Sequence, residues 1–298
     1  MNDQTRKEID KNVLRVLRDA GIREPPVRIE DVLECLELNR TFYDLDDPSL
    51  LQRFHHRITV GGSKLNLKLK RVREKINLAG IWMPDEERII IDKALPPAKQ
   101  EWASFHDTTH TILNWHKPFF LGDTAQTLDP DFQEMLESEA NYGASALMFG
   151  GKLFTKEGLD TRPQWSSIEL LKKRYQKSLV TTLRRYVEFT HNLPMLMMVS
   201  TPWWLEIPSD QPHPWRHVVS SPCFSDAFGR IDPEPFVDLV NSNITKKRGG
   251  VVGGFEFIME NLNGDDCEFT AECFFNSYYV LTMAVFNKKH SVSIRYPS

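Results

Sequence analysis

The stretch Glu101–Asn114, which reads EWASFHDTTHTILN, decides the fold because it contains a histidine pair at metal-ligand spacing. His106 and His110 are four residues apart, so on a helix their side chains lie one turn apart on the same face. Two imidazole nitrogens placed in this way can bind one metal ion. Asp107 directly follows the first histidine, at the position where zinc peptidases with the H-E-x-x-H pattern carry their general base. The stretch therefore predicts a metal-binding helix with an acidic side chain beside the metal.

The residues around the pair have the pattern of a half-buried amphipathic helix. Pro97 suits the first turn of such a helix. One stripe at helical spacing consists of Trp102, Phe105, Thr109, Ile112 and Leu113. The two histidines flank this stripe, which is where ligands on a half-buried helix must lie.

The segment upstream of this helix has the pattern of a β-hairpin. It reads LAGIWMPDEERIIIDK (Leu78–Lys93) and predicts two strands around a turn at Pro84–Glu87. Zincin-type sites are commonly built from a hairpin followed by a metal-binding helix. We expect Arg88–Asp92 to be an edge strand along which an extended peptide could pair.

A second helix offers a third ligand, which catalytic zinc usually needs in addition to an open position. The segment FQEMLESEANYGASALM (Phe132–Met148) contains strong helix formers and includes Glu137 and Glu139. Either glutamate alone could be an ordinary solvated charge. Glu137 and Asn141 are four residues apart on one face, so Glu137 could bind the metal while Asn141 supports a neighbouring ligand. The apolar face of this helix consists of Leu136, Ala140, Ala144 and Leu147.

His116 is an alternative third ligand. It lies ten residues after His106, which is the spacing of the metzincin pattern H-E-x-x-H-x-x-G-x-x-H. That pattern needs glycine at its eighth position so that the chain can turn back, and Leu113 stands there. Asn114 could supply a left-handed residue one step later. We therefore rank His116 below Glu137.

The two motifs together resemble the ImmA/IrrE family of zinc metallopeptidases. The matching runs are FHDTTHTILN (Phe105–Asn114) and ESEANYGASALMFG (Glu137–Gly150). The family pattern is HExxH, then a helix reading roughly E-x-E-A-N-x-F-A-x-x-L-L-x-P. Three further segments are similar, and the resemblance covers roughly residues 10 to 190: GIREPPVRIEDVLECLEL (Gly21–Leu38), RIIIDKALPPAKQEWASFHD (Arg88–Asp107) and SIELLKKRYQKSLVTTLRRYVEFTH (Ser167–His191).

The resemblance implies a zincin-like domain, with a small β-sheet and active-site helices, that binds Zn²⁺. His106, His110 and Glu137 would be the metal ligands, and Asp107 stands where the catalytic glutamate belongs. The chain also departs from the family pattern at Gly143, where an aromatic residue is common, and at Phe149–Gly150, which replaces a proline.

The aspartate matters most among these departures because it shortens the side chain by one methylene, about 1.5 Å of reach. A misplacement of about 1 Å can cost on the order of a hundredfold in rate. One interpretation is a zinc endopeptidase acting on a protein partner, with repressor-like regulators the usual substrates of the family. In this interpretation, zinc activates a water molecule and Asp107 accepts the proton from that water. The other is a metal-binding regulator that acts by protein–protein binding without turnover.

Composition narrows the remaining classes of partner and cellular location. The 298 residues include 37 basic and 41 acidic side chains, a net charge of −4, so direct nucleic-acid binding is not expected. The N-terminal run MNDQTRKEIDKN lacks the apolar core of a signal peptide. The most apolar run, Leu193–Val199, is too short to cross a membrane. Four cysteines without CxxC spacing suit a reducing cytosol. We expect a cytoplasmic protein, and the oligomeric state stays open.

The pattern predicts two domains, 1–192 with the zincin-like site and its trailing helices, and 193–298 with an α+β fold for sensing or substrate docking. Asp232-Pro233 predicts the start of a helix that ends near Ser242. The glycine-rich segment Gly249–Gly254 predicts a turn. A tight hairpin is expected at Asn276-Ser277. Strands are predicted at FEFIME (Phe255–Glu260), EFTAECFF (Glu268–Phe275), YYVLTMAVF (Tyr278–Phe286) and SVSIRY (Ser291–Tyr296).

Overall fold

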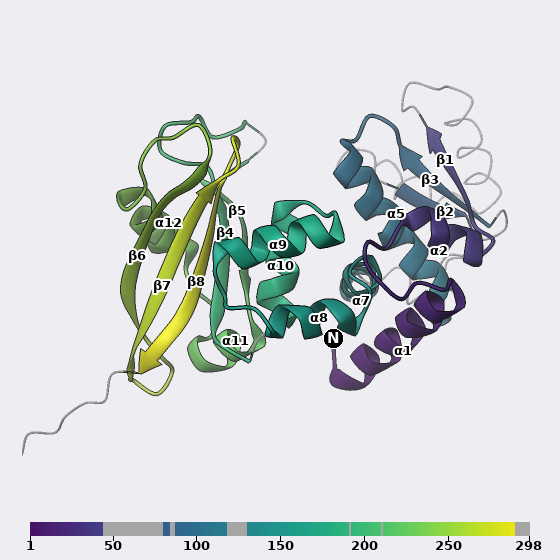
Figure 1. Cartoon of the computed structure of the whole chain (residues 1–298), viewed down its shortest axis with the longest axis horizontal. Helices are drawn as coiled ribbons and strands as arrows, with labels where there is room; N and C mark the ends of the chain where they lie inside the picture. Colours follow the sequence, from purple (N-terminus) through teal and green to yellow (C-terminus); the bar gives the residue numbers. More distant parts are fainter. Residues whose placement is uncertain (44–79, 84–86, 118–129, 191, 210, 290–298) are drawn as a thin grey trace, which may run out of the picture. The chain divides into compact units, whose positions relative to one another are not determined.

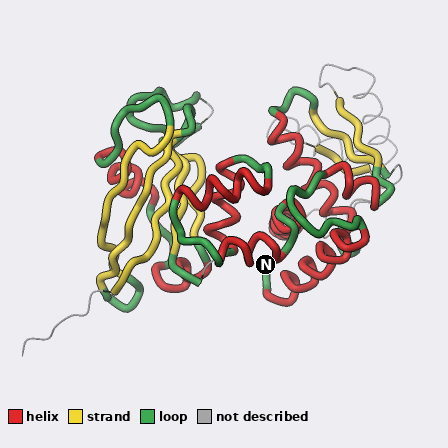
Figure 2. Tube along the Cα trace, in the orientation of Figure 1, coloured by secondary structure: helices red, strands yellow, loops and turns green. Residues whose placement is uncertain are grey.

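The computed structural model describes residues 1–43, 80–83, 87–117, 130–190, 192–209 and 211–289. The chain forms two compact units, Met1–Leu153 and Phe154–Ser298, and each contains helices and strands (Figures 1 and 2). The α+β class is therefore confirmed. The division between the units precedes the predicted 192/193 boundary because the helices after Leu153 pack with the C-terminal strands. The separate roles predicted for 1–192 and 193–298 stay predictions.

The first unit contains, in its described ranges, four helices and a three-stranded sheet. The helices are α1 (Asp3–Asp19), α2 (Ile29–Cys35), α5 (Pro97–Ile112) and α7 (Pro130–Met148). The strands are β1 (Asn39–Tyr43), β2 (Gly80–Met83) and β3 (Arg88–Asp92), in the order β1-β3-β2.

The predicted hairpin is confirmed, but the expectation that Arg88–Asp92 is an edge strand is wrong. Strand β2 pairs antiparallel with β3, from Gly80 opposite Ile91 to Met83 opposite Arg88. Strand β1 pairs in parallel along the other side of β3. Both hydrogen-bonding edges of β3 are therefore occupied within this chain, which fits its continuous run of buried isoleucines. Residues 84–86 of the predicted turn lie outside the described ranges.

Helix α5 is the central element of the first unit. It begins at Pro97, as the sequence predicts, and it packs on β2 and β3 as well as on α7. Its side chains from Ala103 to Phe105 and from Asp107 to His110 are buried. This burial includes hydroxyl groups, which bond back to the helix: Thr109 Oγ1 donates to the Phe105 carbonyl at 2.8 Å.

Gly143 sets how closely α5 and α7 approach each other. A Cβ atom at this position would overlap the Thr109 methyl group, and it would also be 3.1 Å from Ile9 Cγ2 of α1. Only a residue without a side chain allows this contact. The departure from the family pattern at Gly143 therefore has a packing reason, and the close crossing is what brings side chains of α5 and α7 together.

The second unit is a five-stranded antiparallel sheet with helices. Its strands are β4 (Met195–Ser200), β5 (Trp215–Ser220), β6 (Gly250–Glu260), β7 (Asp266–Phe275) and β8 (Val280–Lys289), in the order β5-β4-β8-β7-β6. Its helices are α8 (Lys152–Leu159), in which the unit begins, α9 (Trp165–Tyr175), α10 (Leu179–Phe189), α11 (Pro222–Phe228) and α12 (Pro233–Ser242).

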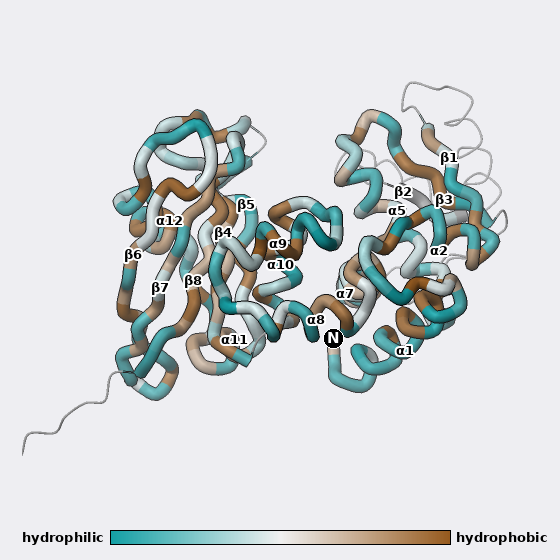
Figure 3. Tube along the Cα trace, in the orientation of Figure 1, coloured by the Kyte–Doolittle hydropathy of each residue, from teal (hydrophilic) through white to brown (hydrophobic). Residues whose placement is uncertain are grey.

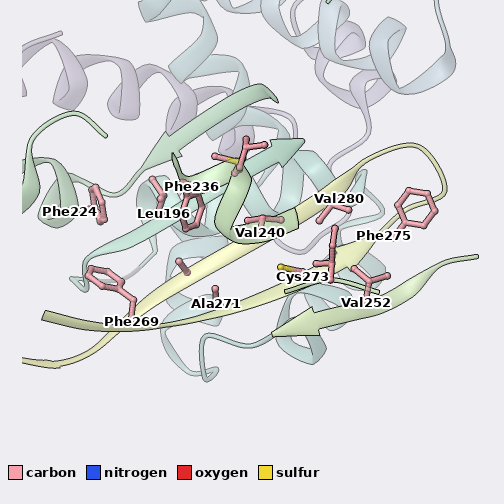
Figure 4. Close-up of a cluster of buried hydrophobic side chains, with 14 of the residues drawn as sticks. Leu196, Phe224, Phe236, Val240, Val252, Phe269, Ala271, Cys273, Phe275 and Val280 are labelled. Atoms are coloured by element: carbon pink, nitrogen blue, oxygen red, sulfur yellow. The ribbon is translucent and has the colours of Figure 1, made fainter. Parts of the chain in front are cut away.

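The main core of the second unit lies between the sheet and helices α11 and α12. Phe236 and Val240 of α12 lie over the sheet, in which β7 carries Phe269 and Ala271 (Figure 4). Helix α10 contacts β4 and β5, and Trp165 of α9 packs its ring 5.2 Å from that of Phe274. Strand β4 is buried at every position, so both of its faces are covered.

Several predictions for the C-terminal region are confirmed. Helix α12 begins at Pro233, and Asp232 caps it by accepting a hydrogen bond from the backbone of Glu234 at 3.1 Å. The hairpin joins β7 to β8, and Ser277 in it has a φ of 77°. The expected turn at Gly249–Gly254 is mostly strand, since β6 begins at Gly250. The run SVSIRY lies outside the described residues.

The described helices carry polar faces. The first turns of α1 are hydrophilic (Figure 3), in agreement with the sequence DQTRKEIDKN. Across the described ranges, every helix is too short or too polar to span a bilayer.

Candidate metal centre

Helices α5 and α7 pack against each other (Figure 1), and they bring together the three predicted metal ligands. His106 Nε2 lies 3.1 Å from Glu137 Oε2, and His110 Nε2 lies 3.8 Å from Glu137 Oε1. The two Nε2 atoms are 3.2 Å apart. One ligand atom from each residue lies within 4.8 Å of the other two, so this group could hold a metal ion.

The spacing of these atoms can be compared with that around a small tetrahedral ion. Zinc bonds to histidine nitrogen and carboxylate oxygen are about 2.0–2.2 Å long, so the edges of the coordination tetrahedron are about 3.3–3.5 Å. The two Nε2 atoms are 3.2 Å apart, which is close to that length, and each lies within 3.8 Å of one oxygen of Glu137. Two imidazoles and one carboxylate also leave a fourth position for water or substrate.

Asn141 holds the first ligand. Its Oδ1 lies 3.1 Å from His106 Nδ1. Because an amide oxygen only accepts, we assign the proton of His106 to Nδ1, which leaves Nε2 free to bind a metal. The sequence predicted from the four-residue spacing that Asn141 could support the surroundings of a metal bound by Glu137, and it did not name His106 as the partner of Asn141.

His116 lies behind His110 instead of among the ligands. The two residues meet through their Nδ1 atoms, 2.8 Å apart. His116 Nε2 lies 3.0 Å from Glu139 Oε2, and this oxygen also accepts a 2.7 Å hydrogen bond from Trp115 Nε1. His116 is outside the group of His106, His110 and Glu137 whose atoms lie close enough to hold one ion, and its role as an alternative third ligand stays a prediction.

The charges of the site favour a neutral His110. Burial, together with the neighbouring His106 and His116, lowers the pKa of His110 to about 2. Burial also acts to lower the pKa of His106, but the hydrogen bond and charge of Glu137 outweigh it and the pKa is raised. A metal needs both imidazoles deprotonated. The neutral form of His110 is therefore favoured, whereas Glu137 favours the protonated form of His106.

Asp107 lies beside the three candidate ligands and is not one of them. It is 7% exposed, and its Oδ2 has no hydrogen-bond partner among the described residues. Burial raises the pKa of Asp107 to about 7; the charge of His106 opposes this rise and that of Glu137 adds to it. A carboxyl group that titrates near neutrality suits proton transfer, whereas a buried oxygen without a partner is costly in a purely structural role. The role of general base stays a prediction.

Glu139 and Trp115 are the site residues that the sequence reading did not assign. Leu136, Glu139 and Gly143 follow one another at spacings of three and four residues, so they share the buried face of α7. A carboxylate on such a face needs donors. Its position on this face could have indicated that Glu139 is buried and hydrogen-bonded. Glu137 lies on the exposed side of the same helix.

Comparisons with known proteins bear on the fold. No family model matches the chain, and no curated protein matches it. Among solved structures, the chain is similar to one titled a Mycobacterium tuberculosis transcriptional regulator, with 11% identity and a TM-score of 0.52. The similarity covers 94% of this chain and 88% of that chain. At this identity it shows a shared fold that extends over both units, and the ImmA/IrrE resemblance stays a prediction.

Proposed function

We propose that this protein is a zinc-dependent endopeptidase that cuts a protein partner. The observation that carries the proposal is the cluster of His106, His110 and Glu137 with the buried Asp107 beside it. Two imidazoles and a carboxylate are the ligand set of many zinc peptidases. When bound, the zinc ion would polarise the scissile carbonyl and make a water molecule more acidic.

In this proposal the residues of the chain divide the remaining work. His106, His110 and Glu137 hold the ion, and Asn141 orients His106. Asp107 accepts a proton from the attacking water, for which a pKa near 7 suits it at neutral pH. An extended substrate cannot pair with β3, because β1 and β2 occupy its two sides.

A second candidate function is a regulator that keeps the metal site and acts by binding a partner. The replacement of glutamate by Asp107 favours it, because the shorter side chain loses about 1.5 Å of reach. The structural neighbour named a transcriptional regulator agrees with this alternative. The two functions differ in whether Asp107 supports turnover.

The test is a series of Asp107 variants in the full chain, with zinc content measured in each. Wild type, Asp107→Asn, Asp107→Glu and the surface control Glu134→Gln are incubated with a proteome-derived peptide library, and new termini are identified by mass spectrometry. We expect about one zinc per chain in all four. We expect cleavage by wild type and Glu134→Gln, and a loss of at least about a hundredfold in Asp107→Asn, since an amide cannot accept the proton.

Each other outcome has a defined meaning. Cleavage that appears only in Asp107→Glu favours the regulator, with a centre one methylene short of turnover. Undiminished cleavage by Asp107→Asn shows that the base lies elsewhere. Equal zinc content in wild type and His110→Ala removes the proposed site altogether.

A further inference from the structure

A chain of buried hydrogen bonds continues from His110 away from the metal ligands. His110 Nδ1 meets His116 Nδ1 at 2.8 Å, and His116 Nε2 meets Glu139 Oε2 at 3.0 Å. Trp115 Nε1 donates to the same carboxylate oxygen at 2.7 Å. His110, His116 and Glu139 are 2%, 0% and 3% exposed. Water therefore cannot easily replace any of these partners.

The carboxylate at the end of this chain fixes the position of every proton in it. An ionised Glu139 only accepts, so His116 carries its proton on Nε2. The Nδ1 of a neutral His116 is then an acceptor, and His110 must donate from its own Nδ1. The lone pair of His110 is left on Nε2, the atom that lies 3.2 Å from His106 Nε2. Glu139 thus selects the tautomer of His110 through the ring of His116.

We propose that Glu139 and His116 are positioning residues, which hold His110 in the tautomer and orientation that bind the metal. This inference rests on the proposed metal centre and adds two residues to it. A carboxylate–histidine pair behind a metal-bound histidine raises the basicity of that ligand and limits its rotation. His106 has the neutral amide of Asn141 in the same place. The arrangement makes His110 the more strongly supported of the two histidine ligands.

A purely structural role explains the chain of bonds less well. Buried polar networks rarely stabilise a fold more than apolar residues of the same volume would. The sheet core of the second unit is packed by apolar side chains, whereas the network beside α7 buries a carboxylate and two imidazoles. The free-energy cost of burying these three polar groups is explained if they position the metal ligand His110.

The experiment measures metal affinity, independently of any peptidase activity. The full-length variants are His116→Leu, His116→Gln, Glu139→Gln and the control Glu134→Gln, which removes an exposed charge from the same helix. Leucine fills similar space without hydrogen bonds. Glutamine can accept from His110 through its oxygen and donate to Glu139 through its nitrogen. Zn²⁺ affinity is determined by competition with a chromophoric chelator, and Co²⁺ absorption reports the coordination geometry.

We expect His116→Leu to weaken Zn²⁺ binding by about 10- to 100-fold and to change the Co²⁺ spectrum. His116→Gln should recover most of the affinity, Glu139→Gln should show a smaller loss, and Glu134→Gln should bind as wild type does. Wild-type affinity in a folded His116→Leu would overturn the proposal, as would equal losses in His116→Leu and His116→Gln. If His116→Leu does not fold, wild-type affinity and an unchanged Co²⁺ spectrum in Glu139→Gln would overturn it.

These outcomes are separate from those of the proposed function. A protein that binds zinc through this network but cuts no peptide loses the endopeptidase proposal and keeps this one. A protein that cuts peptides and binds zinc equally well in all these variants keeps the first proposal and loses the second.

Discussion

The candidate site of the first unit and the sheet core of the second unit bury side chains of different character. Near helices α5 and α7, the first unit buries Asp107, His110, His116 and Glu139. Between the sheet and helices α11 and α12, the second unit encloses a cluster made of apolar residues, including Phe224 (Figure 4). Burying polar groups costs free energy that hydrogen bonds only partly return. The polar groups of the candidate site therefore cost free energy to bury, whereas burial of the apolar cluster stabilises the second unit.

This difference indicates where a ligand acts and where it does not. A cation at His106, His110 and Glu137 would compensate buried polar groups of the candidate site, which lies in the first unit. Substitutions in the hydrophobic core of the second unit should change the free energy of unfolding without changing metal affinity. The predictions below separate these two effects.

The largest effect is expected from Phe269→Ala in β7. Phe269 is fully buried, and its ring lies 5.2 Å from that of Phe228 and 5.3 Å from that of Phe257. Its truncation should lower the free energy of unfolding by about 3–5 kcal/mol, measured by urea denaturation. Ile258→Ala on β6 is the control, because Ile258 is 59% exposed and its loss should cost about 0.5 kcal/mol or less. A large fall in Zn²⁺ affinity in Phe269→Ala would contradict the division between the units.

Removal of the metal should destabilise the first unit and leave the second unit unchanged, in contrast to Phe269→Ala. At free Zn²⁺ about 100-fold above the dissociation constant, binding adds about 2.7 kcal/mol to the stability of the unit that holds the ion. Chelation should therefore speed amide hydrogen exchange in α5 and α7 by up to about a hundredfold and leave β7 and β8 unchanged. The measurement is hydrogen exchange of the full chain with and without chelator. Equal acceleration in β8, or none in α7, would show that the first unit does not depend on the metal in this way.

Much of the site was predictable because it follows from helical periodicity. The spacing of His106 and His110, and that of Glu137 and Asn141, placed four side chains on two helix faces. The start of α5 at Pro97 follows equally from local chemistry. Such features depend on residues within one helix, so one sequence is sufficient to predict them.

Features that depend on two distant segments were not predictable in this way. Arg88–Asp92 was expected at a sheet edge because nothing in Asn39–Tyr43 announces a parallel partner. The buried strand Met195–Ser200 was not predicted, since a strand covered on both faces lacks alternation. The bond between His110 and His116 depends on how the chain turns after Leu113, which spacing alone does not determine.

The smallest effect on stability is expected where α5 and α7 cross. There, adding one methyl group in Gly143→Ala tests the comparison between the units. A Cβ on Gly143 would overlap Thr109 Cγ2, and Thr109 is held in place by its bond to the Phe105 carbonyl. Gly143→Ala should therefore push the helices apart and cost about 1–3 kcal/mol of stability. Because Glu137 moves with α7, Zn²⁺ affinity should fall as well, in contrast to Phe269→Ala.

The matched variant removes the methyl group that the new Cβ would meet. Thr109→Ser keeps the hydroxyl and its hydrogen bond, so Gly143→Ala/Thr109→Ser should recover both stability and Zn²⁺ affinity relative to Gly143→Ala. Thr109→Ser alone is the control and should cost less than the alanine variant, because it leaves only a methyl-sized space. Urea denaturation and chelator competition on the three variants form a double-mutant cycle. If the losses in the cycle simply add, the contact between Gly143 and Thr109 does not set the distance between α5 and α7, and the ligands are positioned by other contacts of these helices.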